Sequence, residues 1–176
     1  LVARFSMQFF FIVSGYFVGG EIIKDATRAA YIAWKRTRRL LLIFLVWFTV
    51  YALEDIQAFM RLAVKDPVGL ALEGPRIHLW FLVSLILTIW LFAIWPLNKK
   101  GYSFLIFGIV VYIFGLLGGP YINAPIGMDL HVNTRDGIFF STLFFAIGVL
   151  IAAKKPNTIP AVAWGIYLAG FVIFSL

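Results

Sequence analysis

Long apolar runs separated by short polar segments dominate the 176-residue chain. Each run is continuous rather than alternating, which favours helices over strands. A hydrocarbon core of about 30 Å requires roughly 20 helical residues, and fewer where flanking groups help. Six runs meet or approach that length: about Phe5–Gly20, Leu40–Leu53, Leu79–Leu97, Tyr102–Leu117, Gly137–Ala153 and Ile159–Leu176. The pattern predicts an all-α, polytopic membrane protein with about six transmembrane helices in residues 1–176, which we treat as one partial domain of a longer protein.

The polar segments between these runs carry unequal charge. Ten of the 15 Lys and Arg residues lie in the first, third and fifth segments, within 21–39, 99–100 and 154–155. The other five are Arg4, Arg61, Lys65, Arg76 and Arg135, and most of the acidic residues share their side. The positive-inside bias therefore predicts that the first, third and fifth segments are cytoplasmic. The second segment, about Glu54–Ile77, is long enough to contain a short helix on the outer surface.

Composition agrees with a membrane protein. The chain is 62% hydrophobic and 13% charged, whereas a soluble domain is about half apolar and about a quarter charged. The net charge of +7 does not indicate nucleic acid, because the positive side chains lie in short segments between apolar runs. With no cysteine, the chain has no disulfide or thiol chemistry. Its two histidines and scattered carboxylates match no recognised metal spacing, so we expect neither a metal nor a bound cofactor.

The densest basic cluster is Lys35-Arg36-Thr37-Arg38-Arg39. Arg36 and Arg39 are three residues apart at the start of the second run, so they share one helix face. Two guanidinium groups at a cytoplasmic membrane surface can hold phosphate through bidentate hydrogen bonds. The alternative is that they fix the topology and contact anionic lipid.

The first run opens on Arg4 and closes on Ser14-Gly15-Tyr16. Arg4 is costly to leave in hydrocarbon, so we expect it at the outer interface or facing a polar interior. Helical rise places Ser14 about 15 Å away along the axis, toward the cytoplasm. Small residues at Ser14-Gly15 allow another backbone to come close. The alternative is a packed interior helix with a snorkelling arginine.

Three further polar or aromatic side chains lie on the predicted outer side. His78 precedes the third run and could act as a base or a hydrogen-bond donor; alternatively it is an ordinary interfacial residue. Trp80 has the position of an aromatic-belt residue. Arg135, beside Asp136, could contact acceptor hydroxyls or form a solvated ion pair that contributes little energy.

Four stretches together resemble the membrane acyltransferase-3 family, the O-acyltransferases of bacterial surface carbohydrates. Phe10-Phe11-Ile12-Val13-Ser14-Gly15-Tyr16 is similar to the family's Phe-Phe-x-x-Ser-Gly helix. Arg36-Thr37-Arg38-Arg39 is similar to its Arg-x-x-Arg motif. The others are His78-Leu79-Trp80-Phe81-Leu82 and Arg135-Asp136-Gly137-Ile138-Phe139-Phe140, the latter followed by a Phe-Phe-x-x-Gly segment. One departure is Gln8, where the family usually has proline.

The resemblance implies an enzyme of the cytoplasmic membrane with about ten helices. It implies a cytoplasmic acyl-CoA co-substrate, with acetyl-CoA the expected one, and a cell-surface glycan or lipid-linked sugar as acceptor. Arg36 and Arg39 would hold the donor phosphates, with the pantetheine arm passing Ser14 and Gly15. Arg4, His78, Trp80 and Arg135 would lie on the acceptor side. The family's catalytic histidine precedes its Phe-Phe-x-x-Ser-Gly helix, so we expect it before Leu1 and assign it to neither His78 nor His131.

Two rival functions remain open. A transporter or flippase for a lipid-linked glycan would favour charged residues within several runs, and the sequence has almost none there. A structural or assembly subunit without chemistry is the other. Acyl-CoA hydrolysis or glycan acylation would distinguish the enzyme from both.

Overall fold

The computed structural model describes residues 2–67, 69–70, 79–96, 101–119 and 137–154. These residues form helices joined by short turns and contain no strand, which confirms the all-α prediction. The helices are α1 (Val2–Ser14), the π-helical η1 (Gly15–Gly19), α2 (Gly20–Lys24), the 3₁₀ turn η2 (Ala26–Arg28), α3 (Ala29–Glu54), α4 (Ile56–Lys65), α6 (Trp80–Ile94), α7 (Tyr102–Leu117) and α8 (Ile138–Ala153).

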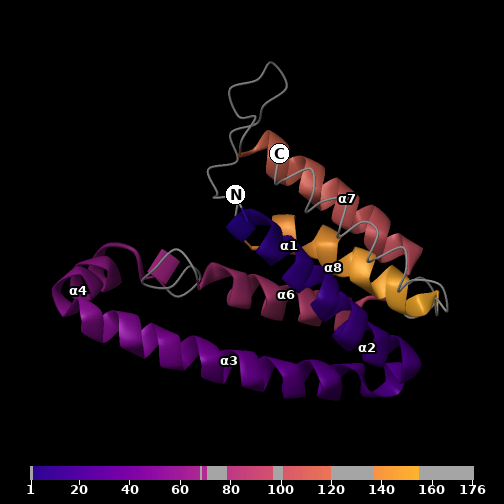
Figure 1. Ribbon diagram of the computed structural model, residues 1–176, viewed down its shortest axis with the longest axis horizontal. Coiled ribbons are helices and arrows are strands. Elements are labelled where there is room, and N and C mark those ends of the chain that lie inside the picture. Colours follow the sequence, from indigo (N-terminus) through magenta and orange to yellow (C-terminus); the bar gives the residue numbers. More distant parts are fainter. Residues whose placement is uncertain (1, 68, 71–78, 97–100, 120–136, 155–176) are drawn as a thin grey trace.

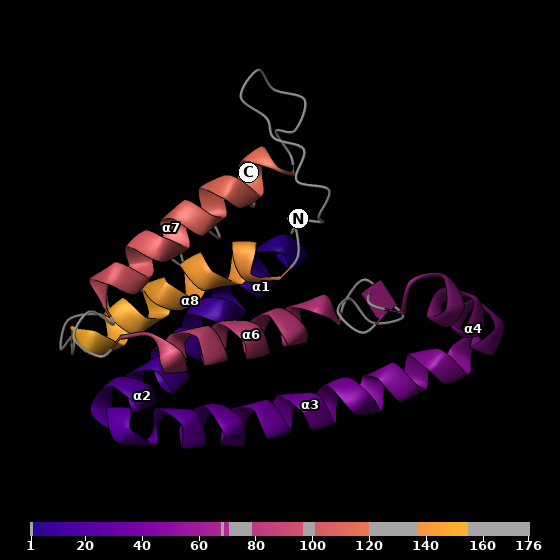
Figure 2. The same cartoon turned by 180° about the vertical axis from the view of Figure 1, so that it is seen from behind.

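Helix α8 lies at the centre of the bundle. It contacts α7 on one side, α6 on another, and the α1–η1–α2 run along its length. Helix α3 packs mainly against α6 and also contacts α2 and η1, and along most of its length α6 lies between α3 and α8 (Figures 1 and 2). At the far end of α3, α4 leaves the bundle and folds back at a sharp angle (Figure 1).

Aromatic rings fill the space where α6, α7 and α8 meet. Phe92, Phe104 and Phe145 are fully buried. The Phe92 ring centroid lies 4.9 Å from that of Phe104 and 5.7 Å from that of Phe145, both in edge-on geometry. Such pairs contribute about 0.5–1.5 kcal/mol beyond the apolar area that they bury. The Trp95 indole N–H donates to the Ser103 hydroxyl at 2.9 Å and joins the end of α6 to the start of α7.

The predicted runs at Tyr102–Leu117 and Gly137–Ala153 match α7 and α8 closely, and Leu79–Leu97 contains α6. The first run extends further than predicted, because helical structure continues from Val2 to Lys24 through the π-helical segment. The run at Ile159–Leu176 lies outside the described residues.

The predicted boundary of the second run is wrong. The sequence placed residues 21–39 in a polar segment, whereas α3 already begins at Ala29 and includes the whole basic cluster. Charge does not end the helix here, because Ala, Lys, Arg and Leu are all strong helix formers. No Gly or Pro interrupts the chain between Ala29 and Glu54. The basic cluster is therefore part of a rigid helix of 26 residues rather than part of a loop.

The short helix expected in the second polar segment is present as α4. Among the described residues no single helix has both the length and the hydropathy to cross a membrane unaided. One pair, Ala26–Glu54 with Phe59–Lys65, meets those requirements jointly and is bent by 112°. Helices α6, α7 and α8 are apolar but shorter. The number of membrane crossings stays a prediction.

Candidate functional site

The N-terminal helix, meaning the continuous α1–η1–α2 run, crosses α8 in backbone contact. A Cβ atom added at Gly15 would fall on the carbonyl oxygen of Phe145, and one added at Gly148 would fall on that of Ile12. A Cβ atom added at Gly19 would overlap the Val149 side chain. This confirms that the small residues at Ser14-Gly15 admit a second backbone. It also means that α8 fills the space beside Gly15 through which the pantetheine arm was expected to pass.

The turn between α2 and α3 reverses the chain and places the basic cluster beside α2. At this turn the Thr27 hydroxyl donates to the Asp25 carboxylate at 2.7 Å, and the Arg28 Nε lies 3.5 Å from its other oxygen. The Thr27 hydrogen bond, with the charge and backbone N–H of Arg28, holds the pKa of the exposed Asp25 carboxyl below its usual value. Asp25 is therefore an anion at neutral pH.

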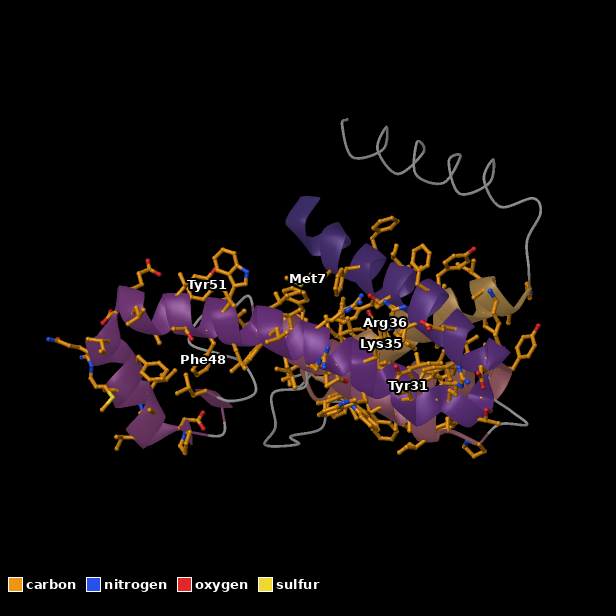
Figure 3. The ribbon with its side chains drawn as sticks, turned by 90° about the horizontal axis from the view of Figure 1, so that it is seen from below. Met7, Tyr31, Lys35, Arg36, Phe48 and Tyr51 are labelled. Atoms are coloured by element: carbon orange, nitrogen blue, oxygen red, sulfur yellow. The ribbon has the colours of Figure 1, made fainter. Side chains whose placement is uncertain are left out.

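Arg36 forms an ion pair that the sequence analysis did not anticipate. Its Nη2 donates to the Oε2 of Glu21 on α2 at 2.6 Å. The two side chains are 34% and 42% exposed, so the pair is partly shielded from water. The Nε of Arg36 is buried without a partner in the described part of the chain. Figure 3 shows Arg36 and Lys35 at the part of α3 that faces the N-terminal helix.

A side-chain hydrogen bond fixes the rotation of α3 at the basic cluster. The Trp90 indole N–H of α6 donates to the buried Thr37 hydroxyl at 2.9 Å. Thr37 continues the buried stripe of Ala29 and Ala33, which faces the bundle. With that stripe held inward, Lys35, Arg38 and Arg39 are exposed. Of the two arginines expected to hold phosphate, Arg39 is therefore the accessible one, and Arg36 is half-buried beside it.

Replacing Thr37 with valine tests this contact. The substitution keeps the shape but leaves the Trp90 N–H without its acceptor, so we expect a loss of about 1 kcal/mol in the free energy of unfolding. Thr49→Val is the matched control, because Thr49 is exposed and its hydroxyl donates to the Leu45 carbonyl within α3. Chemical unfolding of the detergent-solubilised protein measures both. Equal stability of the two variants would contradict the anchoring role of Thr37.

The structure describes only some of the remaining candidate site residues. Ser14 lies at the end of α1, half-buried, immediately before the close crossing with α8. Trp80 is buried, with its ring centroid 6.3 Å from that of Phe140 on α8. Arg4 lies within α1, but its side chain is outside the described set, and His78 and Arg135 lie outside the described residues altogether. The structure thus brings Arg36, Arg39 and Glu21 to one region and leaves the acceptor side untested.

Sequence reasoning missed Glu21, Thr37 and Trp90. Glu21 is one of only two acids in the first polar segment, and that rarity was the available signal. In the sequence, Thr37 is the first of the two variable positions of the Arg-x-x-Arg motif, with nothing else to single it out. Among the described residues no group of three or more His, Cys, Asp or Glu residues could hold a metal ion.

The ends of α2, α7 and α8 that border the first, third and fifth polar segments gather at one end of the bundle. A Cβ at Gly20 on α2 would lie 2.9 Å from the Ala152 Cβ, so the end of α8 with Lys154 adjoins α2. A Cβ at Gly101 would lie 3.4 Å from the Leu150 side chain, which places the start of α7 at the same end. The turn at Asp25, the start of α7 and the end of α8 therefore share one end, as the charge pattern predicted for the first, third and fifth polar segments.

Comparison with known proteins gives three findings. An amino-acid racemase from Enterococcus faecalis is 28% identical over 172 residues, which cover 89% of this chain and 24% of that protein. A serine/alanine racemase from Enterococcus gallinarum is 27% identical over 199 residues, covering 99% of this chain and 28% of that protein. The chain thus spans about a quarter of the length of these relatives. No solved structure matches the chain.

A family model described as an acyltransferase domain matches residues 1–176. The match includes the α1–η1–α2 run with Ser14-Gly15, the basic cluster on α3, and α6 to α8, which together form the bundle. Because this match covers the whole chain, the chain belongs to the acyltransferase-3 family.

Proposed function

We propose that the chain is part of an integral-membrane O-acyltransferase that moves a short acyl group, such as acetyl, from cytoplasmic acyl-CoA to a cell-surface carbohydrate. The observation that carries the proposal is the match of the acyltransferase model to residues 1–176. In the reaction an acceptor hydroxyl oxygen attacks the thioester carbonyl. The new C–O bond replaces the C–S bond, and the hydroxyl proton leaves with the CoA thiolate.

The exterior of the bundle supports a membrane location. Large apolar side chains are more than half exposed on α1, η1, α3 and α7, among them Phe9, Phe17, Leu42, Val46 and Ile106. Apolar patches of this extent are uncommon on soluble monomers, because water around them is unfavourable. Lipid tails would cover them at little cost. The basic end of the bundle would then lie in the cytoplasm, by the positive-inside bias.

The basic cluster supports a phosphate-bearing donor at that end. Lys35, Arg38 and Arg39 are exposed on one turn of α3, and Arg36 lies beside them. Glu21 accepts one hydrogen bond from Arg36, whose guanidinium has further N–H donors. The helix holds the four cations at fixed spacing, which suits the several phosphates of CoA. We propose that Arg39 and Arg36 contact the donor phosphates. Since α8 occupies the space beside Gly15, the pantetheine arm would pass the open side of Ser14.

Binding of acetyl-CoA to the full-length protein in detergent tests the donor site. We expect Arg39→Ala to weaken binding about ten-fold or more, because a charged hydrogen bond contributes about 1.5–3 kcal/mol. Arg36→Ala should also weaken binding, with some loss of stability because Glu21 loses its partner. Arg28→Ala is the control: it removes the same charge from an arginine whose side chain is 73% exposed, at the preceding turn.

The control should bind acetyl-CoA as the unmodified protein does. If the Arg36→Ala, Arg39→Ala double variant is folded and still binds acetyl-CoA with unchanged affinity, the donor site proposed here is wrong. Transfer of labelled acetyl to isolated cell-envelope carbohydrate then tests the reaction itself. Because two relatives are named as racemases of amino acids, free serine is a second acceptor to include. Movement of a lipid-linked glycan without acetyl transfer would favour the transporter instead.

A further inference from the structure

Helix α4 carries an apolar stripe that nothing in the described part of the chain covers. Ile56, Met60 and Val64 recur every four residues, so they line one face, and they are 59%, 58% and 83% exposed. Leu53, near the end of α3, is 71% exposed as well. Three large side chains aligned on one short helix differ from the single apolar residues scattered over ordinary surfaces.

The contact between α4 and α3 is made at one flank of this stripe. The Phe59 ring centroid lies 5.6 Å from that of Phe48 on α3, in edge-on geometry. Phe59 is half-buried by this contact. Met60 and Val64 lie about 100° and about 140° around the helix from Phe59, and Ile56 lies about 60° from it, so Val64 is the farthest from that edge. Figure 3 shows Phe48 and Tyr51 near the α4 end of α3, far from Arg36 and Lys35.

Beside the apolar stripe runs a polar one, called here the basic stripe, whose two cations are Arg61 and Lys65. Gln57, Arg61 and Lys65 also recur every four residues, one position on, and all three are exposed. The Arg61 Nε donates to the Gln57 carbonyl at 3.3 Å, which keeps the stem of Arg61 along the helix. An exposed apolar face bordered by cationic side chains is the pattern of helices that lie in a membrane interface. The sharp bend after α3 would turn α4 from the direction of a membrane-crossing helix toward the membrane plane.

We propose that α4 is an interfacial helix that inserts Ile56, Met60 and Val64 into the bilayer surface, where Arg61 and Lys65 bind anionic lipid headgroups. This inference rests on the proposed membrane location of α3. It assigns α4 to the end of α3 opposite the donor site. There it would hold that end of the bundle at a fixed depth in the membrane. The occupant is lipid, because Arg61 and Lys65 beside the stripe complement anionic headgroups and because α3 also exposes large apolar side chains.

Nitroxide labels on single cysteines of the full-length protein test this placement, with any native cysteines elsewhere replaced. The protein is reconstituted in vesicles of phosphatidylcholine with phosphatidylglycerol. The Met60→Cys label should be more accessible to oxygen than to a water-soluble nickel chelate, at a depth of roughly 5–10 Å below the phosphates. The Gln57→Cys label, on the polar face, should show the opposite preference. The Val46→Cys label on α3 should lie deeper than either.

The outcomes separate the inference from the proposed function. If the Met60 label is shielded from both oxygen and the nickel chelate, protein covers the stripe. If the chelate reaches the Met60 label as easily as the Gln57 label, the stripe is exposed to water. Either result overturns the inference, and if the Val46 label is still in lipid, the membrane location survives. If the Val46 label also lies in water, the membrane location itself fails.

Lipid charge tests the basic stripe separately. Removing phosphatidylglycerol should make the Met60 label shallower, because each cation near an anionic surface favours binding about five-fold. Neutralising the stripe with Arg61→Gln and Lys65→Gln should abolish this dependence on lipid charge. Arg28→Gln, at the other end of α3, should leave it intact. The same lipid dependence in the neutralised variant would overturn the role assigned to Arg61 and Lys65.

Discussion

Replacing Gly148 or Gly15 with leucine is expected to destabilise the protein more than any other single substitution in the described bundle. At each position even a Cβ atom would fall on a main-chain carbonyl oxygen of the facing helix, from Ile12 and Phe145 respectively. A rotamer change cannot relieve contact with a backbone atom, so the two helices must separate. Overpacking of this kind costs about 1–3 kcal/mol, and occasionally more. Thermal unfolding of the detergent-solubilised protein should show a loss of about 2–4 °C for each kcal/mol.

The two glycines lie at one crossing, which makes their effects interdependent. Once Gly148→Leu has separated the helices, the leucine at position 15 needs little further separation. The double variant should therefore lose less free energy of unfolding than the sum of the two single variants. Gly101→Ala is the control, since a Cβ there would lie 3.4 Å from the flexible end of Leu150. It should cost less than about 1 kcal/mol. Similar stability of Gly15→Leu and Gly101→Ala would show that the helices do not cross so closely.

The same crossing shows how far the sequence could predict packing. Small residues at Ser14-Gly15 indicated a close helix neighbour, and the structure confirms one. Gly15 and Gly19 are four residues apart, which is the spacing of the small-residue motif of membrane helix pairs. The partner was not predictable, because α8 lies more than 100 residues away in the chain and Gly148 gives no sign of which helix it meets. Pairing depends on three-dimensional fit, which a one-dimensional pattern does not contain.

Helix boundaries followed hydropathy where Gly or polar residues coincided with the ends, as for α7 and α8. They failed at α3, where charge and helix end do not coincide. For the candidate site, the sequence identified Arg36 and Arg39 as neighbours on one helix. It did not predict that Glu21 would hold Arg36 while Arg39 stays exposed. That difference arises from the turn at Asp25 and from the Thr37 contact with Trp90, both of which are tertiary.

Replacing Ser141 with alanine is the second large expected effect. The Ser141 and Thr88 hydroxyls are both fully buried, with their oxygens 2.6 Å apart between α8 and α6. Ser141 also lies 3.1 Å from the Gly137 carbonyl, so one ordering has Thr88 donate to Ser141 and Ser141 donate to Gly137. Alanine at 141 leaves the Thr88 hydroxyl without this partner in an apolar interior. The expected cost is about 1–3 kcal/mol in the free energy of unfolding.

Thr88→Val should cost less than Ser141→Ala, because Ser141 keeps its contact with the Gly137 carbonyl. Combining the two removes both buried hydroxyls, so the double variant should be more stable than Ser141→Ala alone. Ser84→Ala is the matched control: its Oγ is buried with no hydrogen-bond partner in the described part of the chain, so its loss should be neutral or stabilising. Denaturant titration measures all four variants. If Ser84→Ala and Ser141→Ala cost the same, the hydroxyl pair does not join α6 to α8, and close packing alone holds these helices together.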